Sequence, residues 1–272
     1  MTIGIRNNLV SRTAAGQLQD TQTSLARSSQ RLASGSRLDR AGEDASGGAV
    51  ATILSTRSNS VRAAIRNAND GLSLLATNEG AAKTFGDTLT RMRELGVQAS
   101  SETLDNTERA YASDEFDNHI EEMRRLIFST TFNGANIASG LSRTVQVGAD
   151  NDGSHQLSIS GANLKSTQIL VASSDIGTAT GARSAIDDID SATDFLNSTR
   201  ANLGSEMNRL EHAIANATAE VEALSAAASR IEDTDMARET ARMTSLQVRN
   251  QAGTTALAQA KNLSSSVVSL IG

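Results

Sequence analysis

The sequence contains three histidines, the side chains best suited to bind a transition metal or to transfer protons near neutral pH. They are His119, His155 and His212. None lies at a metal-ligand spacing from another histidine, and the chain has no cysteine. We therefore interpret all three as surface residues, and we predict no metal site and no cofactor.

Two pairs of adjacent carboxylates, Glu121-Glu122 and Asp187-Asp188, are the next candidates for acid and base chemistry. Both lie in segments with a helical pattern, where neighbouring side chains point in different directions and cannot flank one substrate. Serines are frequent, but the Gly-x-Ser-x-Gly motif that presents a nucleophilic serine is absent. We predict a protein that is not an enzyme and has no catalytic residue.

A glycine-rich segment lies between Ser34 and Gly48. The spacing Gly42-x-x-x-x-Gly47 approaches that of a phosphate-binding loop, but Gly48 and Ala49 occupy the positions of the required Lys and Ser or Thr. No predicted strand precedes the segment. We therefore predict a non-helical connector between two helices.

A short β element is predicted between residues 132 and 174. Residues 144–147 and 156–160 alternate polar and apolar side chains, and Asp152-Gly153 is a hairpin signal. The acidic run before Gly153 resembles a calcium loop, but Gly148 and Ile159 would stand at the first and last ligand positions. We expect a β-turn, with the β element at one end of a helical rod.

The elements around these residues are long helices. From residue 186 to 231 apolar side chains recur in alternating steps of three and four, the pattern of a coiled-coil seam. No proline interrupts the segment, so we predict one helix, about 69 Å long at ~1.5 Å per residue. The seam positions are Ile186, Ile189, Thr193, Leu196, Arg200, Leu203, Met207, Leu210, Ile214, Ala217, Val221, Leu224, Ala228 and Ile231.

Two further helices are predicted to pack against this seam, at residues 52–100 and 105–129. The first carries four internal glycines, which indicate close helix approach or a local bend. Its stripe is Leu54, Val61, Ile65, Ala68, Leu72, Leu75, Ala82 and Leu89, and the inward residues of the second are Ala112, Phe116, Ile120, Met123 and Ile127.

Both ends of the chain carry weaker stripes. Helices this poor in large apolar residues are marginal alone, so we expect the two to pair with each other and to need further neighbours. The stripes are Ala14, Leu18, Thr21, Leu25, Ser28 and Leu32 at one end, and Gly253, Ala256, Ala260, Leu263, Val267 and Leu270 at the other.

Composition narrows the class of protein. The net charge is −6, and the chain has no Cys or Pro. The aromatic residues are five Phe and one Tyr, without any Trp, so the core must be mainly aliphatic. Six arginines lie in residues 1–40, but they are dispersed and lack aromatic partners for base stacking, so we predict no nucleic-acid binding. The sequence contains no run of about 18 apolar residues, so we predict no membrane insertion. We expect a soluble chain whose export, if it occurs, cleaves no ordinary leader.

Several ordered motifs of the sequence together resemble bacterial flagellin, the subunit of the flagellar filament. They cover both terminal thirds of the chain and the β element. The motifs are Gln30–Arg37 with Asp44, Ala45 and Gly47; Arg66–Ser73; Arg91–Ala99; Thr131–Gly134; Val145–Gly148; Ser229–Asp233; Gln251–Gly253; and Leu257–Ala260.

The resemblance implies a mostly α fold: a long antiparallel coiled-coil rod with a small β-hairpin element at one end and paired terminal helices at the other. Residues 1–42 and 232–272 would form the inner (D0-like) domain and its connectors. Residues 43–132, the β-hairpin element 133–176 and the long helix 177–231 would form the rod (D1-like) domain. The chain is short, so the variable outer domains of larger flagellins are expected to be absent.

The implied function is a structural subunit that self-polymerises into the filament used for swimming motility, its terminal helices folding on assembly. A hook-filament junction protein of the same superfamily is the alternative. Polymerisation would use the terminal helices, and the connector would be shaped by a second set of residues. These sets are Leu18, Leu25, Leu32, Leu257, Leu263, Val267 and Leu270 for polymerisation, and Arg31, Ser34, Gly35, Arg37 and Asp44 for the connector.

The resemblance also implies partners. They are other copies of the chain in a helical homopolymer, a flagellar export chaperone, the cap and the hook-filament junction proteins, with type III export to an extracellular, secreted flagellum. The innate immune receptor TLR5 is a further expected partner. Its recognition motif matches Leu89, Arg91, Leu95 and Glu115, while Thr90 replaces a usual Gln.

Overall fold

The computed structural model describes residues 8–40 and 42–271, with side chains to residue 262. The chain forms two compact units: unit 1 comprises residues 1–56 and 223–272, and unit 2 comprises residues 57–222. Long helices make up most of both units, and two small antiparallel sheets lie in unit 2, so the predicted mostly α class is confirmed. In the described part, no helix combines the length and the apolar character needed to cross a membrane.

The helices agree closely with the periodicity of the sequence. In chain order they are α1 (Leu9–Ser34), α2 (Ala45–Ala99), α3 (Asn106–Ser129), α4 (Leu164–Val171), α5 (Ala179–Glu232) and α6 (Met236–Ile271). Two details differ from the prediction. The segment from residue 45 is helical despite Gly47 and Gly48, because Asp44 accepts a hydrogen bond from the Gly47 N–H and caps the first turn. The short α4, which Asn163 caps, was not predicted.

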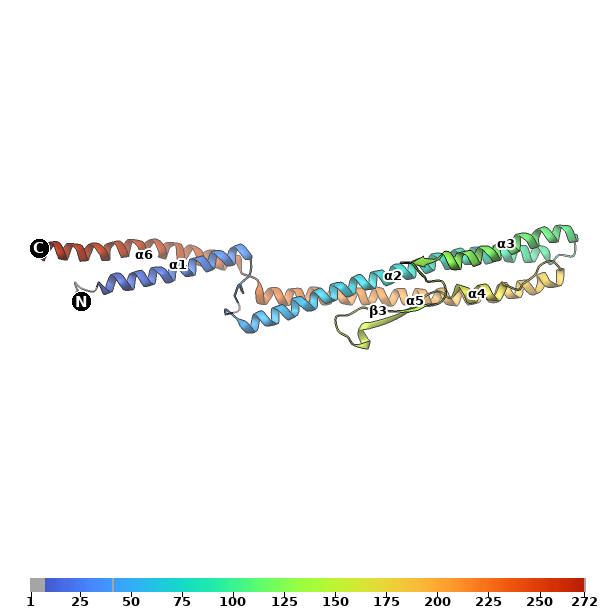
Figure 1. Cartoon of the computed structure of the whole chain (residues 1–272), viewed down its shortest axis with the longest axis horizontal. Coiled ribbons are helices and arrows are strands. Elements are labelled where there is room, and N and C mark those ends of the chain that lie inside the picture. Colours follow the sequence, from blue (N-terminus) through green and yellow to red (C-terminus); the bar gives the residue numbers. More distant parts are fainter. Residues whose placement is uncertain (1–7, 41, 272) are drawn as a thin grey trace. The chain divides into compact units, whose positions relative to one another are not determined.

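The core of unit 2 is the predicted seam. The α5 positions Ile189, Leu196, Leu203 and Leu210, seven residues apart, are buried. All five inward residues predicted for α3 are buried as well, and they belong to the same cluster as Phe85, Leu89 and Met92 of α2. Figure 1 shows α2, α3 and α5 running alongside one another within this unit.

The β element consists of two hairpins. Strands β1 (Thr131–Phe132) and β2 (Ala135–Asn136) are joined by Asn133 and Gly134, both with positive φ, the usual choice for a two-residue hairpin turn. Strands β3 (Ser142–Gln146) and β4 (Gln156–Ser160) pair antiparallel from Ser142 with Ser160 to Gln146 with Gln156.

The position of the β3–β4 hairpin corrects one expectation. It lies along the side of the helices and packs closely at Gly71, where a Cβ would lie 3.1 Å from Val145 Cγ2 and 3.4 Å from Leu210 Cδ1. The turn between α2 and α3 contains no strand. Because α3 runs back along α2 for 24 residues, the chain enters the hairpin beside the α2–α5 pair and not beyond its end.

Unit 1 contains the paired ends of the chain. Figure 1 shows α1 beside α6, in opposite directions, and the Asn8 Nδ2 donates to the Ala260 carbonyl over 3.0 Å. Every predicted stripe residue of α1 is buried or half-buried. Among the α6 side chains up to residue 262, one predicted position was wrong: Ala256 is exposed and Leu257 faces inward, since the α6 face runs through Leu246, Gly253, Leu257 and Ala260.

Candidate functional site

Two of the histidines make local contacts with nearby acidic residues. His119 Nε2 lies 3.8 Å from Glu115 Oε1, and the His155 Nδ1 accepts a hydrogen bond from the Asp150 N–H. No cluster of three or more His, Cys, Asp or Glu side chains in residues 8–40 and 42–271 is positioned to hold a metal ion. The candidate sites are therefore surfaces and connections.

The first surface is the α1–α6 pair. A groove of about 510 Å³ runs along it, lined among others by Val10, Leu18 and Gly253. A Cβ at Gly253 would lie 3.2 Å from Leu18 Cδ1, so the glycine lets the two helices approach closely. On the outer faces Leu9 and Val248 are 69% and 60% exposed. Two helices can cover only one face of each other, and apolar residues remain in solvent.

The residues predicted for polymerisation divide into two groups. Leu18, Leu25, Leu32 and Leu257 are half-buried in the α1–α6 contact. The side chains of Leu263, Val267 and Leu270 lie outside the described residues.

The connector after α1 begins with a defined turn. Gly35 adopts φ 73°, the left-handed conformation that glycine tolerates best, and its N–H donates to the Arg31 carbonyl. Arg31 Nη2 lies 3.0 Å from Glu43 Oε1, and the hydrogen bond from Arg31 lowers the pKa of Glu43 below its ordinary value. The Ser34 hydroxyl accepts a hydrogen bond from the Ser36 N–H over 3.2 Å. The ion pair between Arg31 and Glu43 thus connects the last turn of α1 with the end of the connector that precedes α2.

The second connector, between α5 and α6, pairs with the first. The Arg37 N–H donates to the Glu232 carbonyl over 2.6 Å, and the Thr234 N–H donates to the Gly35 carbonyl over 2.8 Å. The Arg37 guanidinium donates to the Ile231 carbonyl and also lies 3.9 Å from Asp44. Arg37 and Gly35 therefore join two segments nearly 200 residues apart in sequence.

Sequence reasoning identified Arg31, Ser34, Gly35, Arg37 and Asp44 as connector residues but missed their partners. The only signal for the second connector was the Ser229–Asp233 motif, which did not indicate a pairing with residues 35–37. Backbone hydrogen bonds leave no side-chain pattern, so the pairing is visible only in the structure.

Two of the predicted receptor-recognition residues are buried, and the other two lie on the surface. Leu89 and Leu95 are 1% and 2% exposed and belong to the core. Arg91 and Glu115 lie on the surface of α2 and α3, with their charged atoms 2.7 Å apart. The hydrogen bond from Arg91 lowers the pKa of Glu115 below its ordinary value of 4.5. The structure thus brings together the two charged residues and buries the two leucines beneath them.

A row of ion pairs between α2 and α5 was also missed. Arg93 lies 2.7 Å from Asp190, and Arg200 lies 2.7 Å from Glu79. The pKa of Asp190 is lowered, mainly by the hydrogen bond from Arg93. Such exposed pairs contribute little individually because solvent screens them, and they mark which charged residues of α2 and α5 lie opposite each other.

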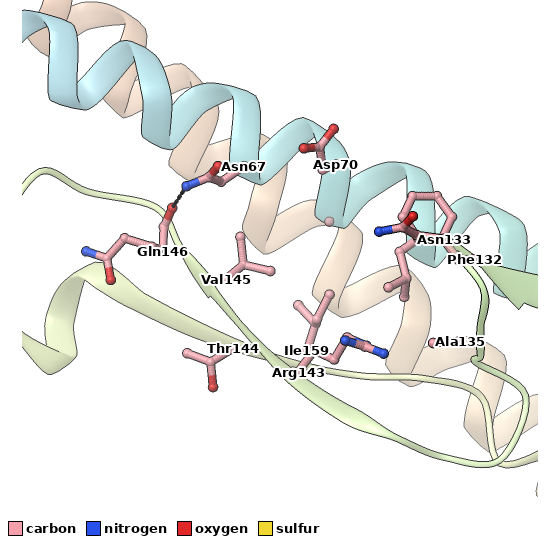
Figure 2. Close-up of a pocket in the computed structure, with 12 residues that line it drawn as sticks. Asn67, Asp70, Phe132, Asn133, Ala135, Arg143, Thr144, Val145, Gln146 and Ile159 are labelled. Atoms are coloured by element: carbon pink, nitrogen blue, oxygen red, sulfur yellow. Dashed lines mark hydrogen bonds between the residues drawn. The ribbon is translucent and has the colours of Figure 1, made fainter.

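A third feature is a groove of about 400 Å³ between the β3–β4 hairpin and α2 (Figure 2). Asn67 Nδ2 donates to the Gln146 carbonyl across one end, 3.4 Å away. Arg143 and Asp70 line the groove, and neither forms an ion pair within the described part of the chain. The groove is open and of mixed polarity, without convergent groups that would select a ligand.

Comparison with known proteins agrees with this architecture. A family model described as the bacterial flagellin N-terminal helical region matches residues 5–143, and one described as the bacterial flagellin C-terminal helical region matches residues 186–271. The two matches together include both chain ends, both connectors and most of unit 2.

Individual relatives extend over nearly the whole chain. The flagellin of Halalkalibacterium halodurans is 38% identical over 244 residues, which cover 89% of this chain and 90% of that protein. Flagellin FlaB2 of Treponema pallidum is 31% identical over 285 residues, covering 98% and 99%. The crystal structure of Bacillus cereus flagellin superimposes with a TM-score of 0.50 at 26% identity, over 56% of this chain and 88% of that one. None of these matches favours a hook-filament junction protein.

Proposed function

The chain belongs to the bacterial flagellin family and is a structural subunit of the flagellar filament, and from this premise we propose that its terminal helices complete their folding only when other copies surround them. Assembly and folding of α1 and α6 are then one process. Unit 2 is the part that is folded beforehand.

One observation carries the proposal: in the described part of unit 1, α1 and α6 pack mainly against each other, and much of their surface is exposed. Ordering the 26 residues of α1 costs roughly 1–2 kcal/mol per residue in backbone entropy. Full burial of a Leu or Val side chain contributes only about 1.5–3 kcal/mol, and Leu18, Leu25 and Leu32 are only half-buried in the pair. Neighbouring copies would supply the missing apolar surface.

The proposal assigns the polymerisation role to Leu18, Leu25, Leu32 and Leu257, together with Leu263, Val267 and Leu270 further along α6. Residues 1–42 and 232–272 would act as the inner domain and its connectors, and residues 43–231 as the rod domain. The paired connectors at Gly35 and Arg37 would keep the two terminal helices adjacent before assembly, which shortens the search for the pair.

Amide hydrogen exchange tests this proposal directly. In dilute monomer, the amides of α1 and of residues 243–271 are expected to exchange within seconds while those of α3 and residues 186–220 of α5 are protected; in filaments both sets are protected. The α3 amides serve as the internal control for exchange conditions. Full protection of α1 in the monomer would show that the ends are stable without neighbours.

Further partners follow from the same family membership. We propose that the chain is exported to the extracellular flagellum by the type III route and that an export chaperone covers the α6 segment. The cap and the hook-filament junction proteins would contact the assembled chain.

A chain lacking residues 243–272 should not co-purify with the chaperone. Retained binding would place the chaperone site elsewhere on the chain.

Recognition by TLR5 is proposed through Arg91 and Glu115 on the exposed surface, with Leu89 and Leu95 acting from the core by holding α2 and α3 in place. Arg91→Ala should lower the potency of the monomer in a receptor reporter assay by roughly tenfold or more, as for a charged contact central to an interface. Arg93→Ala is the matched control, because Arg93 is equally exposed and pairs with Asp190. An unaltered chain that stays silent where a standard flagellin activates would exclude the interaction.

A further inference from the structure

The loop that joins β3 to β4 closes around the side chain of His155. Beyond the last paired residues of the two strands, the Val147 N–H donates to the His155 carbonyl over 2.8 Å. The imidazole packs directly on Gly148, where a Cβ would lie 2.5 Å from the His155 Cγ. Only 32% of the His155 side chain is exposed. The histidine is therefore held in one place by the backbone of its own loop.

One ring nitrogen of His155 is a hydrogen-bond acceptor. The Asp150 N–H donates to the His155 Nδ1 over 3.2 Å. A ring nitrogen that accepts a hydrogen bond carries no proton, so the imidazole is neutral in this arrangement and its proton lies on Nε2. The bond that joins the Asp150 backbone to His155 therefore depends on the charge state of the histidine.

The carboxylate of Asp150 connects the same loop to α2. Its Oδ2 atom lies 3.3 Å from Nη2 of Arg57, and Nε of Arg57 donates to Glu220 of α5 over 2.9 Å. The same Asp150 oxygen lies 3.6 Å from the His155 Nδ1. Asp150 thus contacts the histidine through both its backbone and its side chain, and its carboxylate is shared with an arginine that stays charged.

Protonation of His155 would turn Nδ1 from an acceptor into a donor. The Asp150 N–H and the new imidazole N–H would then face each other, an arrangement that leaves both groups without an acceptor. The Asp150 carboxylate is the acceptor available to the new N–H, and it would move toward the imidazole and away from Arg57. Arg57 keeps Glu220, so the connection between α2 and α5 persists while the connection between α2 and the loop is lost.

The other charged groups around the histidine do not offset this change. On the same loop, Asp152 accepts a hydrogen bond from the backbone two residues later, over 3.3 Å, and caps the turn that ends at His155. From α2 and α5 the groups are Arg57 and Glu220, which pair with each other. Asp150 is therefore the carboxylate that responds to a proton on His155.

We propose that His155 is a pH-dependent switch that attaches the β3–β4 loop to α2 when it is neutral and detaches the loop when it is protonated. Neutral His155 holds the Asp150 backbone and leaves the Asp150 carboxylate to Arg57. Protonated His155 releases the backbone and takes the carboxylate. Histidine side chains change charge between about pH 5 and 8, so the loop is attached at the upper end of this interval and detached at the lower end. The inference concerns a single chain and goes beyond the proposed function.

Amide exchange measured by NMR on the full-length monomer tests the backbone half of the switch. Between about pH 8 and pH 5, the protection of the Asp150 amide, corrected for the intrinsic pH dependence of exchange, should fall by about tenfold, since one hydrogen bond is lost. The fall should follow the titration of the His155 ring. His212, which is exposed on α5, titrates in the same sample and should leave the protection of its neighbouring amides unchanged.

His155→Asn is the matched variant. Its side-chain oxygen can accept from the Asp150 N–H as Nδ1 does, but an amide takes up no proton in this pH interval. The Asp150 amide should therefore stay equally protected at both ends of the interval, and thermal melting establishes that the variant is folded. A pH response that persists in His155→Asn, or equal protection at both pH values in the unaltered chain, would overturn the switch.

A distance measurement tests the detachment from α2. The chain has no cysteine, so two spin labels can be attached to a chain carrying Asn151→Cys in the loop and Asn59→Cys on α2, both at exposed positions. The distribution of distances between the labels should be narrow at about pH 8 and should shift to longer, broader values at about pH 5, except when His155→Asn is added. An identical distribution at both pH values would overturn the detachment. Because both measurements use the monomer, a negative result leaves the filament role intact.

Discussion

Removal of residues 1–30 or of residues 243–272 is expected to abolish polymerisation completely while unit 2 still unfolds cooperatively. Either deletion takes one partner from the α1–α6 pair, and the remaining helix then has no apolar surface to cover it. Unit 2 keeps its own core, which consists of the α2, α3 and α5 side chains around Phe116, Leu196 and Leu203. Electron microscopy of seeded samples and thermal melting followed by circular dichroism measure the two effects separately.

Single substitutions in α1 test its role in polymerisation without removing the helix. Leu25→Ser removes an apolar contact between α1 and α6 and should strongly raise the critical concentration, whereas Gln22→Ser, on the exposed side of α1, should have little effect. Loss of the cooperative melting transition in either deletion would show that unit 2 depends on the terminal helices. Filaments from a chain lacking residues 1–30 would contradict the role assigned to α1.

Phe116→Ala is expected to lower the free energy of unfolding of unit 2 by about 3–5 kcal/mol. Phe116 is fully buried at the centre of the α2–α3 contact, so the substitution removes a large apolar side chain and leaves a cavity that two rigid helices cannot close. Denaturant unfolding of the monomer measures the change in stability.

Phe128→Ala is the matched control, since it makes the same chemical change on the same helix. Phe128 is largely exposed, and its removal should change the stability of the monomer by no more than about 0.5 kcal/mol. Equal losses for the two variants would mean that Phe128 is covered within the monomer, and a small loss for Phe116→Ala would mean that α3 is not part of the cooperative unit.

The two connectors that lead to the terminal helices are joined to each other. The chain leaves α1 at Gly35 and leaves α5 at Glu232, and the two exits are hydrogen-bonded to each other through backbone groups and the Arg37 side chain. A change in either connector therefore reaches both terminal helices at once.

The prediction of the helices succeeded because the signal is long and regular. The α5 seam repeats over 46 residues, and a shift of one position would expose every buried leucine from Leu196 to Leu210, so periodicity alone fixes which face is buried. The same argument placed all five inward residues of α3. It was less precise for α6, where Ala256 and Leu257 are both apolar neighbours and either can continue a three-four stripe.

Other features could not be derived from periodicity. The start of α2 depends on a cap at Asp44 that offsets the low helix propensity of Gly47 and Gly48. The β3–β4 hairpin packs closely against α2 at Gly71, which lies beside Val145. A glycine in the sequence allows such a contact but does not show which segment makes it. The burial of Leu89 agrees with its place on the predicted stripe, whereas Leu95 was not on that stripe and its burial is seen only in the packed structure.

The sequence by itself determined the family, the helical class, the seam of α5 and the faces that α1 and α3 bury, because these are properties of repeated local spacing. Only the tertiary structure decided which segments meet: the two connectors, Arg91 with Glu115, the hairpin with Gly71, and Phe128 left exposed beside Lys165. The physical reason is that such contacts depend on where helices and backbone hydrogen bonds bring distant residues, and that position is not encoded in the spacing of any one segment.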